Sequence, residues 1–317
     1  MHFDHMDDYI LPVRIVSTVI LLLGTSFHSL IIYITGKRTR DDCRFYALFM
    51  KIYSCISIYI FVIGWLLINR FCYGKQTLIV FYGFGSYFGT EFCTFLESLY
   101  NPMNNVLYLM TPLGMLFRVL IVFDRKLKRI WILKSVLAVV FLHVPTMIMS
   151  SRAFLPLSAA NLTSLDDNTQ IFVDQYPAVI YKPATFFENV VLVRISYRYM
   201  YFCVPVTYVL GFITYQRLRS RSFCITERTA AIHRAFILLL FTEATLLCSG
   251  FLYDIGNTLD PFFPEANFPL HMDIYDSVLV SIVPLGQGIA TICIVPYFRP
   301  YLMSCCRRKI TNSDVVL

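Results

Sequence analysis

The chain has 317 residues, of which 57% are hydrophobic, 16% aromatic and only 15% charged, and its mean hydropathy is +0.63. Soluble domains carry about 25% charged residues, so this composition excludes an ordinary soluble protein and predicts a polytopic membrane protein. The net charge of +7 follows from the membrane topology described below and does not indicate nucleic-acid binding.

Long apolar stretches recur seven times along the chain. In chain order they cover about residues 9–35, 45–68, 90–116, 130–150, 195–215, 235–253 and 274–297. About 20 helical residues cross the hydrocarbon core of a bilayer, where a helix satisfies its own backbone groups. The sequence therefore predicts an all-α membrane protein, a single seven-transmembrane domain over residues 1–317 that ends in a short cytoplasmic tail, 298–317.

The basic residues predict the orientation. Most Lys and Arg residues follow the first, third and fifth spans or lie in the tail, whereas residues 1–8 contain none. By the positive-inside rule, the amino terminus is expected outside the cell and the carboxyl terminus in the cytoplasm. The expected location is the plasma membrane.

Three features are candidates for covalent modification. An Asn-x-Thr sequon at Asn161 lies in a loop that is expected outside, where it is either glycosylated or a chance match. Cys305 and Cys306 precede a basic run just after the last span, which suits palmitoylation, although two unmodified thiols are the alternative. Cys72 and Cys93 could form a disulfide on the outer side, but spacing alone does not fix their pairing.

Polar side chains within the apolar spans are the candidate ligand-binding residues, because a polar group in hydrocarbon usually faces a cavity or a partner. They are Glu97, Tyr100, Asn101, Asn104, Arg198 and Glu243. The four in the third span can share one helix face. For Glu97 a cavity-facing role is favoured over a protonated structural role, and for Glu243 an interhelical hydrogen bond is the stronger interpretation.

Arginine residues lie at the end of the fifth span and at the start of the third cytoplasmic loop. Arg217, Arg219 and Arg221 form a plausible contact surface for an acidic partner. The same cations would also hold anionic lipid, so the topology alone is enough to explain them.

Three short motifs carry a family resemblance. They are the run Phe81–Gly89 before Cys93, the span-three exit Phe117–Leu120, and the ending Ile294–Tyr301. With these motifs the chain resembles nematode serpentine chemoreceptors of the Str superfamily, and most closely the Srd class.

This resemblance implies a rhodopsin-like G-protein-coupled receptor on sensory-neuron membranes, with sensory cilia as a further expectation. Its ligand would be a small odorant or pheromone-like molecule bound in the outer half of the bundle, and its partner a heterotrimeric G protein. Arg118 would then be the span-three cation that takes part in coupling. The alternative for Arg118 is an Arg that snorkels from a helix end to the interface.

The departures from the general receptor pattern favour a divergent chemoreceptor class. The chain lacks an Asp-Arg-Tyr triplet after span three and an Asn-Pro-x-x-Tyr motif in span seven, and the loop after span four has no cysteine. The alternative function is a multi-pass transporter or channel-like protein for a small solute. No enzyme motif, cofactor site or metal site is apparent, so no catalytic activity is expected.

Overall fold

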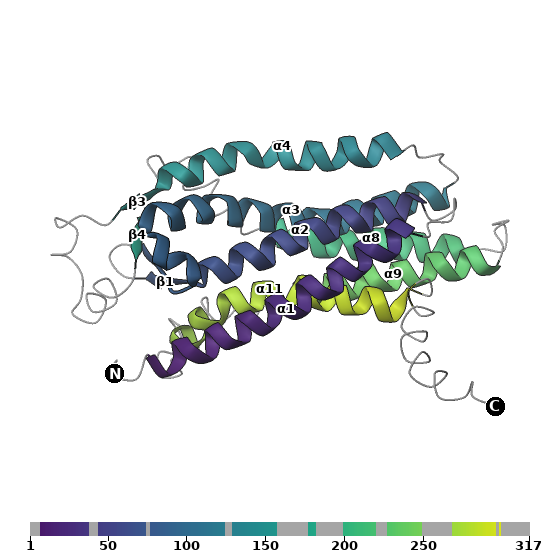
Figure 1. Ribbon diagram of the computed structural model, residues 1–317. Coiled ribbons are helices and arrows are strands. Elements are labelled where there is room, and N and C mark those ends of the chain that lie inside the picture. The colour runs from purple at the N-terminus through teal and green to yellow at the C-terminus, as the bar shows by residue number, and fades with distance from the viewer. Residues whose placement is uncertain are drawn as a thin grey trace, which may run out of the picture.

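The computed structural model describes residues 7–37, 44–73, 77–123, 129–156, 177–181, 199–219, 227–248, 268–295 and 298. Within these residues, seven long helices run side by side (Figure 1). They are α1 (Asp7–Lys37), α2 (Arg44–Leu67), α3 (Thr90–Val122), α4 (Arg129–Ala153), α8 (Tyr199–Arg219), α9 (Glu227–Leu247) and α11 (Phe268–Ile294).

Each predicted apolar span overlaps one of these helices, but some boundaries differ. Helix α9 begins at Glu227 rather than near residue 235, and α11 begins at Phe268 rather than near residue 274. Hydropathy locates the apolar part of a helix, whereas intrahelical hydrogen bonds continue into the polar turns beyond it. The division into one membrane domain and a tail stays a prediction.

The helices have the lengths that a bilayer requires. In α1, α2, α3 and α4, apolar stretches long enough to cross a membrane cover Ile10–Gly36, Ala47–Leu67, Thr90–Val122 and Ile130–Ala153. Helices α8, α9 and α11 are 21, 21 and 27 residues long, which also reaches across about 30 Å of hydrocarbon.

Helix α3 is the centre of the bundle. It contacts α2, α4, α8 and α9, while α1 packs against α2 and α11, and α9 packs against α8 and α11. Helix α4 lies at the edge of the bundle (Figure 1). A side chain placed anywhere on α3 is therefore well positioned to link several helices.

Glycines allow the closest helix contacts. A Cβ atom at Gly24 of α1 would overlap the ring of Phe61 on α2, and one at Gly211 of α8 would overlap Phe241 on α9. Small residues are common at membrane helix interfaces because they let the two helices approach closely. These glycines therefore fix the α1–α2 and α8–α9 contacts.

A four-stranded antiparallel sheet covers one end of the bundle. The strands are β1 (Asn69–Tyr73), β2 (Thr77–Phe81), β3 (Phe154–Pro156) and β4 (Ala178–Tyr181), in the order β1-β2-β4-β3. The sheet joins the connection between α2 and α3 to the segment that follows α4. We call this end the sheet end; α1 begins there and α11 ends at the opposite end (Figure 1).

A short 3-10 helix, η2 (Phe84–Phe88), connects the sheet to α3. The chain enters the sheet at Ile68, whose φ of 32° lies in the left-handed region that L residues rarely adopt. The amide of Ile68 donates to the Gly64 carbonyl and its own carbonyl accepts from Tyr82. These bonds end α2 and direct the chain into β1.

Candidate functional site

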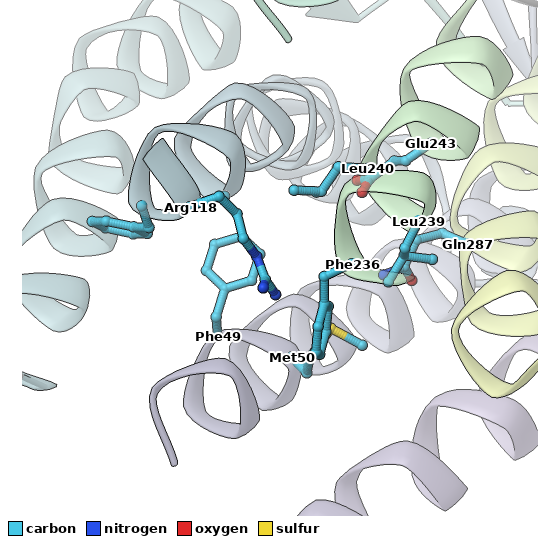
Figure 2. A pocket seen from close by; sticks show the side chains of 10 residues that line it. Phe49, Met50, Arg118, Phe236, Leu239, Leu240, Glu243 and Gln287 are labelled. Carbon is cyan, nitrogen blue, oxygen red and sulfur yellow. The ribbon is translucent and has the colours of Figure 1, made fainter. Parts of the chain in front are cut away.

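A small cavity lies between four helices in the half of the bundle away from the sheet. It measures about 20 Å³, which is close to the space one water molecule needs. Its walls come from α2, α3, α9 and α11 (Figure 2), and they consist of Phe49, Met50, Gly114, Phe117, Arg118, Phe236, Leu239, Leu240, Glu243 and Gln287. The cavity is too small for an odorant, so its interest lies in the polar groups around it.

Arg118 is among the largest fully buried side chains in the described part of the bundle, with 2% of its surface exposed. Its guanidinium carbon lies 3.9 Å from the ring centroid of Phe236, and Nη1 lies 3.4 Å from Nδ1 of His233. Both partners are on α9. Because a guanidinium can only donate, Nδ1 must accept, which requires a neutral His233 ring. The burial of Arg118 argues against the snorkelling interpretation.

Gly114 makes room for this arrangement one turn earlier on α3. A Cβ atom at this position would lie 2.9 Å from the ring of Phe49 and 3.3 Å from Leu240. Phe49 also packs edge-on against Phe117, with ring centroids 6.3 Å apart. The glycine thus lets α2 and α9 approach α3 beside Arg118.

Glu243 lies on the other side of the cavity and joins α9 to α3. The hydroxyl of Thr111 donates to its Oε1 at 2.6 Å, and the carboxyl group is fully buried. The Tyr53 hydroxyl interacts with the same carboxyl, although its geometry falls short of a formed hydrogen bond. The bond from Thr111 is the interhelical hydrogen bond favoured for Glu243 from the sequence.

Gln287 of α11 also lines the cavity (Figure 2). Its side chain is buried, and its Oε1 has no hydrogen-bond partner among the described residues. A buried amide oxygen usually has a partner, and the cavity has space for a water molecule that would supply one.

Glu97 occupies a different level, close to the sheet. Asn69 donates to its Oε2 at 2.7 Å and Asn101 donates to its Oε1 at 2.6 Å, and the carboxyl group is completely buried. Asn69 is the first residue of β1. Glu97 therefore connects the sheet to α3 through Oε2, while its Oε1 accepts a bond from within the same helix.

Tyr100 and Asn104 are also buried on α3. The Tyr100 ring packs where Gly64 of α2 has no side chain. Oδ1 of Asn104 has no hydrogen-bond partner among the described residues. Thr111, the partner of Glu243, lies fourteen positions after Glu97, or about 21 Å along the helix. The predicted ligand-binding residues that the structure describes therefore fall on two levels rather than at one site.

The described coupling candidates share one end of the bundle. Arg217 and Arg219 are in the last turn of α8, and Arg118 is close to the end of α3. The guanidinium of Arg217 lies 5.3 Å from the ring centroid of Phe123, while Arg219 is exposed.

The cysteine pairing stays a prediction. Cys93 is a free, buried thiol at the start of α3, and the side chain of Cys72 lies outside the described part of the structure. The β2–β4 pairing already joins the first connection to the loop after α4 without a disulfide. Asn161, Arg198, Arg221, Cys305 and Cys306 lie outside the described residues.

His28 is a linking residue that the sequence analysis missed. Its Nε2 lies 2.8 Å from the Pro284 carbonyl and must donate, so Nδ1 accepts from the Ser54 hydroxyl at 3.0 Å. The ring thus joins α1 to α2 and α11. A histidine within an apolar span was itself the available signal, but nothing local indicates its two distant partners.

The comparisons with known proteins identify the family. The sequence matches the family of serpentine type 7TM GPCR chemoreceptors Srd over residues 13–251, a range that covers most of α1 and all of α2, α3, α4, α8 and α9. The chain belongs to this family. It is a multi-pass membrane protein with the predicted seven-transmembrane, rhodopsin-like bundle, and its family is one of chemoreceptors rather than enzymes.

The Srd match confirms the resemblance drawn from the short sequence motifs. No curated protein matches this Srd chain. Among the described residues, no three His, Cys, Asp or Glu side chains gather into a group that could hold a metal ion.

Proposed function

We propose that this Srd chain is a chemosensory receptor that binds a small environmental molecule and signals to a heterotrimeric G protein. The observation that carries the proposal is the buried Arg118, which α9 holds through Phe236 and His233. A cation that a neighbouring helix helps to hold near the end of a central helix can be released when that neighbouring helix moves. The proposed orientation puts the sheet end outside the cell and this end in the cytoplasm, as the distribution of basic residues predicts.

The ligand is proposed to bind in the half of the bundle nearer the sheet. Asn104 supports this placement, because its buried amide oxygen lacks a partner in the described part of the chain and could accept a hydrogen bond from a ligand. Tyr100 supplies an aromatic wall on the same helix. Glu97 and Asn101 already bond to each other, so they hold the site in place, and Arg198 is proposed to close it from the outer end of span five.

In this proposal the receptor signals by changing between two arrangements of the same helix bundle. A ligand favours one packing only by binding it more tightly than the other. Movement of α9 away from α3 would separate Phe236 and His233 from Arg118 and break the bond between Thr111 and Glu243. The exposed guanidinium, together with Arg217, Arg219 and Arg221, would then contact the G protein at the plasma membrane, including that of sensory cilia.

The experiment expresses the chain in cells and screens volatile and water-soluble odorants for a calcium or cyclic-nucleotide response. Arg118→Gln is expected to abolish the response at normal surface expression. Arg152→Gln is the matched control, because Arg152 is exposed in the last turn of α4, next to the sheet, and it should leave the response unchanged.

Two results would overturn the proposal. One is an unchanged response in the Arg118→Gln variant at matched surface expression. The other is concentrative uptake of a labelled odorant into vesicles that contain the purified chain, without any G-protein response, because this result would favour a transporter.

A further inference from the structure

Five aromatic rings form a continuous patch at the sheet end of the bundle. We call Trp65, Phe84, Tyr87, Phe88 and Phe92 the aromatic patch. Trp65 stacks on Phe84 with centroids 5.6 Å apart, and Phe84 contacts Tyr87 and Phe88 edge-on at 5.7 and 5.9 Å. Phe88 reaches Phe92 on α3 at 5.1 Å.

The patch faces outward. Tyr87, Phe88 and Phe84 are 72%, 62% and 50% exposed. Three large neighbouring rings with this exposure are unusual where only water surrounds a protein, since exposed apolar patches mark a binding surface or a membrane contact.

The backbone beneath the rings prevents them from turning inward. A Cβ atom at Gly83 would overlap the Leu66 carbonyl, and one at Gly85 would lie 2.8 Å from the same oxygen. The Gly83 amide donates to the Leu67 carbonyl at 2.8 Å, and the Ser86 hydroxyl donates to the Gly83 carbonyl at 2.7 Å. Glycine backbone therefore packs on the end of α2, which leaves the outer side of η2 to the rings.

The patch is continuous with the membrane-facing surface of the bundle. Trp65 is in the last turn of α2 and Phe92 in the first turn of α3, and both helices are long and apolar enough to cross a membrane. The indole nitrogen of Trp65 donates to the Thr18 hydroxyl on α1 at 2.9 Å. One turn beyond the patch, Phe95 of α3 is also exposed.

We propose that the aromatic patch lies in the boundary between lipid headgroups and acyl chains and anchors this end of the receptor at a fixed depth. Trp and Tyr concentrate at this boundary because their rings are apolar while their N–H and O–H groups can still bond to headgroups or water. The position of the patch, where α2 ends and α3 begins, is where a crossing helix meets that boundary. The β-sheet, which begins just after α2, then lies beyond it in the headgroup region or in water.

The test uses tryptophan fluorescence, since the chain has only two tryptophans, Trp65 and Trp131. Tyr87→Trp is placed in a background in which both are replaced by Phe, and the purified full chain is reconstituted in phosphatidylcholine nanodiscs. Quenching is measured with lipids brominated near the headgroup, with lipids brominated deep in the acyl chain, and with aqueous iodide. Leu22→Trp in the same background is the control for depth, because Leu22 is exposed near the middle of α1.

For Tyr87→Trp we expect shallow bromine to quench about twofold more than deep bromine, with the opposite order for Leu22→Trp. Phe88→Trp should repeat the shallow pattern and serves if the first variant does not fold. Quenching by iodide alone would show that the patch lies in water. Protection from both iodide and lipid bromine would show that protein covers the aromatic patch. A depth equal to that of Leu22→Trp would show that the patch lies among the acyl chains and not at their boundary with the headgroups. Each of these three results overturns the proposal.

Discussion

The buried carboxyl groups of the bundle accept hydrogen bonds both from other elements and from their own helix. Glu97 and Glu243 are both fully buried, yet their partners differ: two amide donors for Glu97, and a hydroxyl donor for Glu243. The sequence placed Glu97 and Asn101 on one helix face because four positions make one turn. It could not indicate Asn69 or Thr111, since those contacts depend on how separate elements pack.

The different donors lead to different responses to the same substitution. In Glu97→Gln the new amide nitrogen faces the amide nitrogen of Asn69 or Asn101, so two donors oppose each other unless that Asn turns its amide over and loses its present orientation. In Glu243→Gln the remaining carbonyl oxygen can still accept from Thr111. We expect Glu97→Gln to lower the free energy of unfolding by about 1–3 kcal/mol and Glu243→Gln by a few tenths, as measured by thermal unfolding in detergent. Equal effects from the two substitutions would contradict the hydrogen bonds described.

His233 offers a test of the contact that holds Arg118. His233→Asn keeps an acceptor near the position of Nδ1, whereas His233→Lys places a second cation close to the guanidinium, which now lies 3.4 Å from the ring nitrogen. Like charges this close destabilise the packed state. We therefore expect a severalfold higher ligand-independent G-protein signal in His233→Lys, and a signal near the wild-type level in His233→Asn. The same basal signal in both variants, at equal surface expression, would show that this contact does not restrain the receptor.

At the scale of elements, the sequence predicts the long helices far better than the sheet. A crossing helix leaves a local signal, a long apolar run, in one stretch of chain. The hairpin of β1 and β2 also leaves a local signal in the sequence, because two short runs rich in β-forming residues flank residues 74–76. Strands β3 and β4 left almost none, because they are three and four residues long and pair across distant parts of the sequence.

The register of the sheet can be tested by cross-linking. Val80 of β2 is opposite Ala178 of β4, and the neighbouring bond from the Phe81 amide to the Pro177 carbonyl makes this a non-hydrogen-bonded pair. In such pairs the Cα atoms are about 4.5 Å apart, which suits a disulfide. We expect Val80→Cys with Ala178→Cys to form a bond on mild oxidation, detected by peptide mass spectrometry.

The control for this cross-link is Val80→Cys with Ile180→Cys. Ile180 pairs with Leu78 rather than with Val80, and its diagonal position is about 7–8 Å away, so little cross-link is expected. Equal cross-linking of the two double variants would contradict the register.

Close packing of α1 against α2 depends on Gly24. A methyl group there would overlap the buried ring of Phe61, whereas at Gly36 the nearest atom is the Lys51 nitrogen, 4.0 Å away. Overpacking costs about 1–3 kcal/mol. We expect Gly24→Ala to lower the thermal unfolding temperature in detergent by several degrees and the matched change Gly36→Ala to leave it unchanged or slightly higher. A neutral Gly24→Ala would show that the two helices are not this close.

For the whole molecule, composition and hydropathy were enough to predict a seven-helix membrane protein, and short motifs were enough to identify its family. The candidate site was harder to predict. Arg118 could be named from its place after span three, but its burial and its contacts with Phe236 and His233 arise from the packing of α9 on α3. A local pattern cannot carry that information.

The central claim is a receptor that crosses the membrane an odd number of times, with the sheet end outside and Arg118 near the cytoplasm. The most direct measurement places one epitope tag before Met1 and another after Leu317 and stains cells before and after permeabilisation. The account predicts that the first tag is labelled on intact cells and the second only after permeabilisation. Labelling of both tags on intact cells, or of neither, would contradict it, and labelling of the second alone would reverse the proposed orientation.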